Sequence, residues 1–347
     1  ADYYALGGIF LSSRVLEAKN RIGAHRLKIP LISAQGKNIG QAIGVQEGGY
    51  QNSRHKKIGD MPVYIRGDPL KLGPVIPRRF PLILAGDKQK TINELTGQSG
   101  RLELARWIAS PENPLTARVM VNRIWHFHFG RGLVHTPSNF GRRGGKPSHP
   151  QLLDYLAARF VESRWSLKAL HRLIMNSATY QRDSGRAEPG KEDADPENIL
   201  LSRFSTRRLS AEEIHDSLLA VSGRGGKRAV YTRVGHEHSS LIANLFDAPA
   251  TGTIAPGRTE STTAPQGLYM MNDKSVISAS RALANRLAKK SGSDETQIRM
   301  AYEFIYGRIA AQAEIEAGKA FLAEQEDAER WAYFHVLLCA NEFMYID

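Results

Sequence analysis

The stretch from residue 101 to residue 181 limits the possible folds most, because its helical sequences carry clear start and stop signals. Asn113 and Pro114 supply an N-cap and a proline in the first turn, and the apolar run LTARVMVNRIWHFHF then continues to Gly130. Pro150 stands directly before QLLDYLAARFVES, where it opens a second helix. The stretch therefore predicts helices packed against helices rather than a sheet.

The same signals recur further along the chain. Ser166 precedes LKALHRLIMNSATY, and Ser210 with Glu213 forms a capping box before IHDSLLAVSG. Helical periodicity predicts three more helices, near residues 273–290, 294–306 and 327–341.

Two other regions lack this helical pattern. Residues 21–97 are rich in glycine and proline, and MPVYIRGDP within them is a short β-type run that ends in a turn. Residues 224–265 have no helical period, and stretches of this length inside compact domains are often functional. We expect a mainly α fold, with a small irregular β-containing lobe at 21–97 and a multi-helix domain at 98–347 that carries a long loop insertion at 224–265.

Composition argues against a membrane-spanning protein and against covalent haem c attachment within this segment. With 41% hydrophobic residues among 347, the chain is long enough to form a packed core, but it has no run of about 18 apolar residues that would span a membrane. Its single cysteine, Cys339, lies in the apolar run FHVLLCA, where a thiol usually behaves as a small buried hydrophobe. Covalent haem c attachment requires C-x-x-C-H, so we expect no cofactor in this segment.

The formal net charge of +12 raises the question of a polyanionic partner. The basic residues form short runs, RHKK at 54–57, RRGGK at 142–146, RR at 207–208 and GRGGKR at 223–228. Three explanations stay open: solvated faces with internal ion pairs, an acidic polysaccharide or acidic protein partner, and nucleic acid. Nucleic acid is the least favoured of the three, because aromatic residues do not interleave with the basic runs to stack on bases. Arg142, Arg143 and Lys146 are candidate ligand-binding residues.

Polar residues recur at four-residue spacing on the helix after Pro114. Arg118, Asn122 and His126 share one stripe, and apolar residues occupy the opposite face and the flanks of that stripe. We therefore expect a helix that is buried nearly all round. Arg118 and Asn122 either fix neighbouring loops by hydrogen bonds or form the polar floor of a ligand pocket.

Two histidine pairs suggest metal at first sight. His126 and His128 are two positions apart on a helix, so their rings diverge and we reject a shared metal site. His236 and His238 would share a face if the backbone is extended, and Asp247 would supply a third ligand. They are weak candidates for a metal site.

Two charge pairs with the same spacing lie far apart in the sequence. IRGDP places Arg66 and Asp68 on one face if extended, and PGRTEST does the same for Arg258 and Glu260. Each pair either locks a loop as a salt bridge or holds a substrate and transfers protons. If the two segments meet, Arg66 would face Glu260 and Arg258 would face Asp68. With His126, these four residues are the candidate catalytic residues.

Several segments resemble a known module of unknown function. They include RLELARWIASPENPLTARVMVNRIWHFHFGRGLVHTPSNFG, RRLSAEEIHDSLLAVSG, LFDAPATGTIAPGRTESTTAPQGLYMMND and HVLLCANEFMYID, in that order. The chain is similar to the family called domain of unknown function 1553, found in exported planctomycete proteins after a cytochrome-c-like domain. The segment GVQEGGYQNSRHKKIGDMPVYIRGDPLKLGPVIPRRF resembles the beginning of that module, although only residues 11–43 separate it from DYYALGGIF.

The resemblance has further implications. Residues 1–20, with DYYALGGIF, resemble the tail of the domain that normally precedes the module, so we expect the C-terminal part of a longer or processed protein. It implies an extracytoplasmic location, at the cell surface or in the periplasm, and covalent haem c only in a domain outside this chain. It also implies two protein partners, the upstream domain of the same parent protein and an exported sulfatase-like protein.

The sequence leaves two hypotheses for function. It contains no Ser-His-Asp signature, nucleotide-binding glycine loop or cysteine-rich metal pattern. The leading hypothesis is a binding or assembly module that engages an acidic polysaccharide or a partner protein. The alternative is a polysaccharide-active enzyme with Arg66, Asp68, His126, Arg258 and Glu260 in one cleft.

Overall fold

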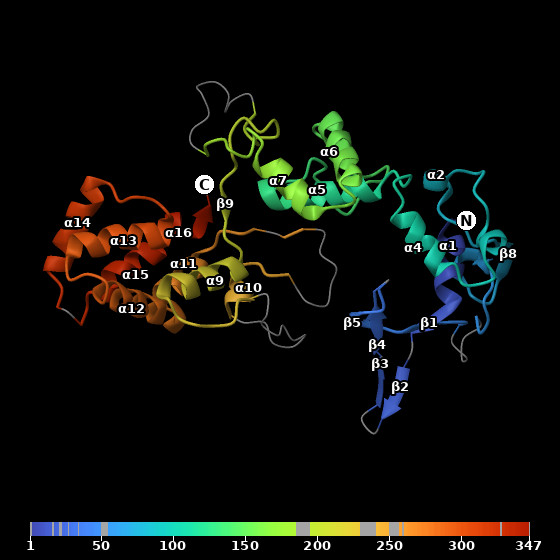
Figure 1. Cartoon of the computed structure of the whole chain (residues 1–347), viewed down its shortest axis with the longest axis horizontal. Coiled ribbons are helices and arrows are strands. Elements are labelled where there is room, and N and C mark those ends of the chain that lie inside the picture. The colour runs from blue at the N-terminus through green and yellow to red at the C-terminus, as the bar shows by residue number, and fades with distance from the viewer. Residues whose placement is uncertain are drawn as a thin grey trace. The chain divides into compact units, whose positions relative to one another are not determined.

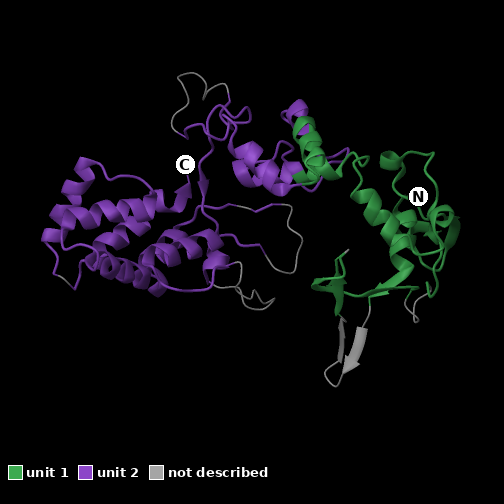
Figure 2. Ribbon diagram, in the orientation of Figure 1, with its two compact units in different colours: residues 1–120, 154–165 green, residues 121–153, 166–347 purple. Residues whose placement is uncertain are grey.

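Helices dominate the computed structural model (Figure 1), which confirms the mainly α prediction. The structure describes residues 2–15, 17–20, 23–26, 28–33, 35–49, 55–184, 195–229, 241–249, 257–258, 260–326 and 328–346. The chain divides into two compact units (Figure 2). Unit 1 contains residues 1–120 and 154–165, and unit 2 contains residues 121–153 and 166–347.

The first part of unit 1 is the β-containing lobe that the sequence predicts. Its strands pair in antiparallel twos, β1 with β6, β2 with β3, β4 with β5 and β7 with β8. The strands are β1 (Ser13–Val15), β2 (Glu17–Asn20), β3 (Gly23–Arg26), β4 (Lys28–Ile32), β5 (Asn38–Ile43), β6 (Val45–Glu47), β7 (Met61–Tyr64) and β8 (Leu72–Ile76). The helical elements are α1 (Asp2–Leu11), η1 (Ile65–Gly67), α2 (Leu82–Ala85), α3 (Ile92–Leu95) and α4 (Arg101–Ile108).

A small apolar cluster holds this lobe together. It consists of Ile9, Phe80, Ile92 and Leu104, and the ring of Trp107 stacks on Phe80 with 4.9 Å between ring centroids. These residues come from α1, α3, α4 and the segment before α2, so a few apolar side chains connect the short helices of the lobe.

The expectation of an extended IRGDP segment is wrong. Tyr64 pairs with Leu72 across the β7–β8 hairpin, so the chain must reverse direction between them. Residues 65–67 form the short helix η1, and Arg66 adopts a left-handed backbone conformation with φ of 54°. The turn therefore determines the backbone here, and Arg66 and Asp68 do not share the face of a strand.

Two helices cross the boundary between the units in sequence: α5 (Thr116–Phe129) and α6 (Pro150–Glu162). The remaining helices belong to unit 2: α7 (Leu167–Met175), α9 (Ala211–Ser222), α10 (Leu241–Leu245), α11 (Ala264–Asn272), α12 (Lys274–Ala288), α13 (Asp294–Tyr306), α14 (Gln312–Ala323), α15 (Trp331–Cys339) and α16 (Asn341–Met344). A short antiparallel pair, β9 (Arg207–Arg208) with β10 (Tyr345–Ile346), joins the chain before α9 to its end.

Unit 2 contains two neighbouring apolar clusters. One gathers buried residues of α9, α11, α12, α15 and α16, among them Ile214, Met270 and Leu338. The other gathers residues of α12, α13, α14 and α15, among them Leu283 and Ile298. Helices α12 and α15 both contribute to the two clusters and so connect them.

The predicted capping signals are confirmed at several helix ends. The Asn113 side chain accepts hydrogen bonds from the N–H groups of Leu115 and Thr116, and Gly130 ends α5 with a positive φ. Ser166 caps α7, and Ser210 with Glu213 forms the capping box of α9.

The number of helices after residue 224 is larger than the sequence analysis predicted. The expected helices appear as α12, α13 and α15, but α10 lies inside the expected loop insertion, and α11, α14 and α16 were not predicted. The signals were present: Thr263 with Gln266 caps α11, and Glu314 binds the N–H of Ala311 at the start of α14. Ala311 is not one of the residue types that mark an N-cap, which explains why the start of α14 was overlooked.

No helix within the described ranges is long and apolar enough to cross a membrane. Cys339 is half-buried, its thiol donates to the Met270 carbonyl oxygen at 3.3 Å, and burial raises the pKa of the thiol.

Candidate functional site

Asn122 fixes the loop that follows α5. Its side chain has no exposed surface, Nδ2 donates to the Val134 carbonyl oxygen at 2.9 Å, and Oδ1 accepts from the Val134 N–H at 2.7 Å. This confirms the prediction that Asn122 forms hydrogen bonds with a neighbouring loop. The contact also explains why residue 132 is a glycine, since a Cβ atom at this position would lie 2.7 Å from Nδ2 of Asn122.

The expectation that α5 is buried all round is wrong. Arg123 is exposed, and Phe127, one turn later on the same stripe, is 67% exposed. Neighbours cover only the side that carries Asn122 and the buried apolar residues. Arg118 is partly exposed. It donates to the Pro114 carbonyl oxygen at 2.6 Å and to Asp154 of α6 at 2.6 Å, so its guanidinium group connects α5 to α6.

The loop from 131 to 149 carries the basic run RRGGK on a well-defined backbone. Thr136 donates from Oγ1 to the Asn139 carbonyl oxygen at 2.7 Å and accepts from the Gly145 N–H at 2.8 Å. The Ser148 N–H donates to the Leu133 carbonyl oxygen at 2.8 Å and closes the loop at its base. The loop is therefore held at both ends and across its middle.

Three cations stand on this loop without an acidic partner. Arg142, Arg143 and Lys146 are exposed, and within the described ranges no carboxylate lies within ion-pair distance of them. Lys146 also lines a cavity of about 200 Å³ between this loop and residues 197–205. The wall of this cavity includes Trp125 and His135, and Arg131 pairs with Glu197 at its edge at 2.8 Å.

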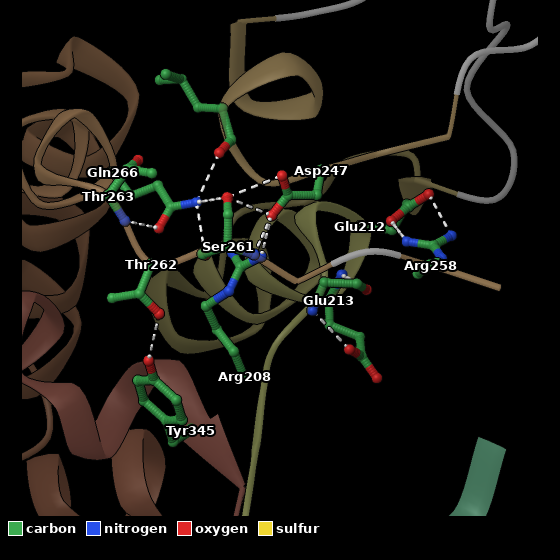
Figure 3. Close-up of polar contacts among 12 residues, drawn as sticks. Arg208, Glu212, Glu213, Asp247, Arg258, Ser261, Thr262, Thr263, Gln266 and Tyr345 are labelled. Atoms are coloured by element: carbon green, nitrogen blue, oxygen red, sulfur yellow. Dashed lines mark hydrogen bonds and ion pairs between the residues drawn. The ribbon is translucent and has the colours of Figure 1, made fainter. Parts of the chain in front are cut away.

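Three of the five candidate catalytic residues belong to one polar cluster in unit 2, at the start of α9. Arg258 binds Glu212 through two hydrogen bonds of 2.5 and 2.8 Å (Figure 3). His126 is half-buried and lies next to Gly257. A Cβ atom added at Gly257 would lie 3.8 Å from Nε2 of His126. Burial lowers the pKa of His126 and Arg123 lowers it further, whereas the negative charge of Glu260 raises it.

The carboxylates at the start of α9 are both ion-paired. The hydrogen bonds from Arg258 lower the pKa of Glu212. Burial alone would raise the pKa of Glu213, but hydrogen bonds from Arg207 and from the Ser210 N–H lower it to about 2. Both side chains are therefore negatively charged at neutral pH and bound to guanidinium groups.

The other two candidates, Arg66 and Asp68, belong to unit 1. Asp68 accepts a hydrogen bond from the Leu70 N–H at 2.9 Å within its own turn. Because Arg258 has Glu212 as its partner, the expected pairing of Arg258 with Asp68 is not the one observed. A pairing of Arg66 with Glu260 stays a prediction.

A second polar network, which the sequence analysis did not foresee, lies beside this cluster in Figure 3. Arg208 donates to Asp247 at 2.8 Å, and Ser261 donates to the same carboxylate from its N–H at 2.8 Å and its hydroxyl at 2.9 Å. The buried Gln266 amide donates to the carbonyl oxygens of Leu245 and Ser261. The only signal in the sequence was polar residues at the edges of apolar runs, as in RRLSAEE and TTAPQG.

The metal candidates give no assembled site within the described ranges, where no three histidine, cysteine or acidic side chains gather. His236 and His238 lie outside those ranges. Asp247 is in contact with Arg208 and Ser261, and its φ of 57° shows that the backbone bends sharply there. His128 binds His171 at 2.8 Å, away from His126 as the helical spacing requires.

Comparison with known proteins identifies the family. The family model PSD1, described as a protein of unknown function (DUF1553), matches residues 100–322. The match covers more than half of the chain, and the chain belongs to this family. No curated protein and no solved structure matches it.

Proposed function

We propose that this member of the DUF1553 family is a binding module that engages an acidic polysaccharide through the loop 131–149. The observation that carries this proposal is the set of three exposed cations, Arg142, Arg143 and Lys146, which have no ion-pair partner among the described residues and lie on a loop with an internally hydrogen-bonded backbone. A fixed loop loses little conformational entropy on binding, so more of the electrostatic attraction remains as affinity.

The neighbouring cavity favours a sugar polymer over a purely ionic partner. Lys146 belongs both to the basic run and to the cavity wall that contains Trp125, His135 and Ser205. Cationic, aromatic and hydroxyl groups side by side suit a ligand with acidic groups on a ring that has both polar and apolar faces. An acidic protein segment would use the cations but leave the cavity unexplained.

The positions of the candidate catalytic residues favour binding over catalysis. The cavity beside the loop 131–149 is not lined by Arg66, Asp68, His126, Arg258 or Glu260. Glu212 and Glu213, the carboxylates next to this cluster, are neutralised by arginines rather than free for proton transfer. The enzyme stays the second hypothesis, because His126, Arg258 and Glu260 share one neighbourhood.

The resemblance to planctomycete proteins supplies a setting for this activity. In that setting the module lies outside the cytoplasm, follows an upstream domain of the same parent protein and works beside an exported sulfatase-like partner. Residues 1–20 would then be the tail of the upstream domain, and any covalently attached haem c would belong to a domain outside this chain.

Heparin affinity chromatography tests the proposal. The triple variant Arg142→Glu, Arg143→Glu, Lys146→Glu should elute at much lower salt than the wild type, because the interaction is electrostatic and screened by salt. The matched control is Lys56→Glu, Lys57→Glu, Lys71→Glu, which changes the net charge equally at exposed positions of unit 1 and should elute nearly as the wild type does.

Two results would contradict the proposal. Equal loss of retention in both triple variants would mean that heparin senses only the net charge. Displacement of bound heparin by polyglutamate as efficiently as by polygalacturonate would favour an acidic protein partner instead of a polysaccharide.

A further inference from the structure

A second cavity, of about 350 Å³, lies in unit 2 between α12, the start of α13 and the start of α15. None of the residues singled out from the sequence lines it. Its wall combines charged, amide and aromatic side chains, including Arg281, Asn285, Gln297, Arg330, Trp331 and Phe334. The volume is near the lower end for small-molecule sites, which limits the ligand to about one ring with its substituents.

Two arginines, Arg281 and Arg330, line this cavity. The guanidinium group of Arg281 lies 4.7 Å from the centre of the Trp331 ring, and within the described ranges it has no carboxylate in ion-pair distance. Arg330 binds Asp294 through one terminal nitrogen, and its other nitrogens are not part of that ion pair. Among the described residues, the ion pairs of these two guanidinium groups include only the one between Arg330 and Asp294, and this arrangement favours an anionic group on the ligand.

The remaining wall favours a ring that carries hydroxyl groups. Gln297 is 5% exposed, and its Nε2 donates to the Ser291 carbonyl oxygen at 2.8 Å, which fixes the orientation of its amide. Asn285 adds a second amide, while Trp331 and the buried Phe334 supply an apolar surface. Amides bind hydroxyl groups and aromatic rings pack on the C–H face of a sugar.

We propose that this cavity binds one cyclic, hydroxylated carboxylic acid, of the size and chemistry of a hexuronic acid. Arg281 and Arg330 hold the carboxylate, Asn285 and Gln297 bind hydroxyl groups, and Trp331 packs against the ring. The site is separate from the loop 131–149, and the proposal does not rest on polysaccharide binding at that loop.

Isothermal titration of the whole chain with three small probes tests this assignment. D-glucuronate has both the carboxylate and the hydroxyl groups and should bind, with saturation. D-glucose lacks the carboxylate, benzoate lacks the hydroxyl groups, and each should bind at least tenfold more weakly than glucuronate. The fluorescence of Trp331 provides a second readout, and Trp331→Phe identifies its contribution.

Three variants locate the binding. Arg281→Gln should weaken glucuronate binding at least tenfold, and Ala288→Phe should abolish it by filling the cavity edge. The control Arg299→Gln removes a partly exposed arginine of α13 that pairs with Glu295 and does not line the cavity, and it should bind as the wild type does. Circular dichroism checks that each variant is folded.

The outcomes separate this site from the loop. Glucuronate binding that survives the charge reversal of Arg142, Arg143 and Lys146 supports the cavity, whether or not heparin binds. Absence of saturable glucuronate binding, equal binding of glucose or benzoate, or unchanged binding in Arg281→Gln would each overturn the proposal.

Discussion

Two buried arginines, one in each unit, have opposite surroundings. The side chains of Arg78 in unit 1 and Arg208 in unit 2 are each only 3% exposed. Arg78 donates to Asp60 at 3.1 Å, to the carbonyl oxygens of Gln98 and Ser99 at 2.8 and 3.1 Å, and to Asn93. Arg208 donates to Asp247, and its Nε and Nη1 have no acceptor within the described ranges.

The comparison shows that a buried arginine has a different structural role in each unit. The apolar cluster of unit 1 is small, so Arg78 connects segments that apolar contacts alone do not hold. In unit 2 two larger apolar clusters stabilise the fold, and the Arg208 guanidinium lies 5.2 Å from the centre of the Phe246 ring. We conclude that Arg78 is a cross-link in its unit, whereas packing holds Arg208.

The largest effect is expected for Arg78→Met. The variant keeps an unbranched chain of similar length but removes the hydrogen bonds from the guanidinium group to Asp60, to Asn93 and to the carbonyl oxygens of Gln98 and Ser99. Asp60 keeps hydrogen bonds from the Arg78 N–H and from Asn93, so the expected cost of roughly 3–5 kcal/mol in unfolding free energy comes from the loss of the buried ion pair together with the other three acceptors. Urea unfolding followed by circular dichroism measures it. Arg79→Met is the matched neighbour, since Arg79 lies 3.8 Å from Asp2 in a looser contact, and it should lose far less. Equal losses would remove Arg78 from its role as a cross-link.

A smaller effect is expected for Asn122→Ala. One uncharged amide is removed, but the N–H and carbonyl oxygen of Val134 remain in a buried place, which costs about 1–3 kcal/mol. The exposed neighbour Arg123→Ala should stay close to the wild type in the same urea experiment. An unfolding midpoint of Asn122→Ala that matches the control would show that the loop is held by other contacts.

Local features of the fold were predictable from the sequence, because their causes lie within a few residues. The caps of α5, α7 and α9 depend on Asn113, Ser166 and Ser210, whose side chains bind N–H groups two or three positions away. Burial of Asn122 followed from its position on a largely apolar helix. In each case the pattern and the contact involve the same short segment.

Partners distant in sequence were not predictable in the same way. Arg258 binds Glu212, 46 positions away, and nothing in PGRTEST distinguishes that carboxylate from Asp68. Arg208 and Arg78 each stand beside another arginine, in RR pairs whose spacing does not show which member is buried. The prediction that IRGDP is extended was wrong for a related reason. Tyr64 pairs with Leu72, so the chain must turn between them, and the segment itself does not show that pairing.

The smallest effect, and the sharpest test of the comparison, is expected for Arg208→Met. The substitution removes two buried guanidinium nitrogens, Nε and Nη1, that have no acceptor in the described part of the chain, which offsets part of the lost ion pair. Asp247 keeps the hydrogen bonds from the Ser261 N–H and hydroxyl, so its carboxylate is not left without donors. We therefore expect a loss of only about 1 kcal/mol in unfolding free energy, the size of one ordinary hydrogen bond. The double variant Arg208→Met, Ser261→Ala should lose more than the sum of the two single variants, because Asp247 then loses both side-chain donors and keeps only the Ser261 N–H. A loss for Arg208→Met alone as large as that of Arg78→Met would mean that both arginines are cross-links, and the distinction between the two units would fail.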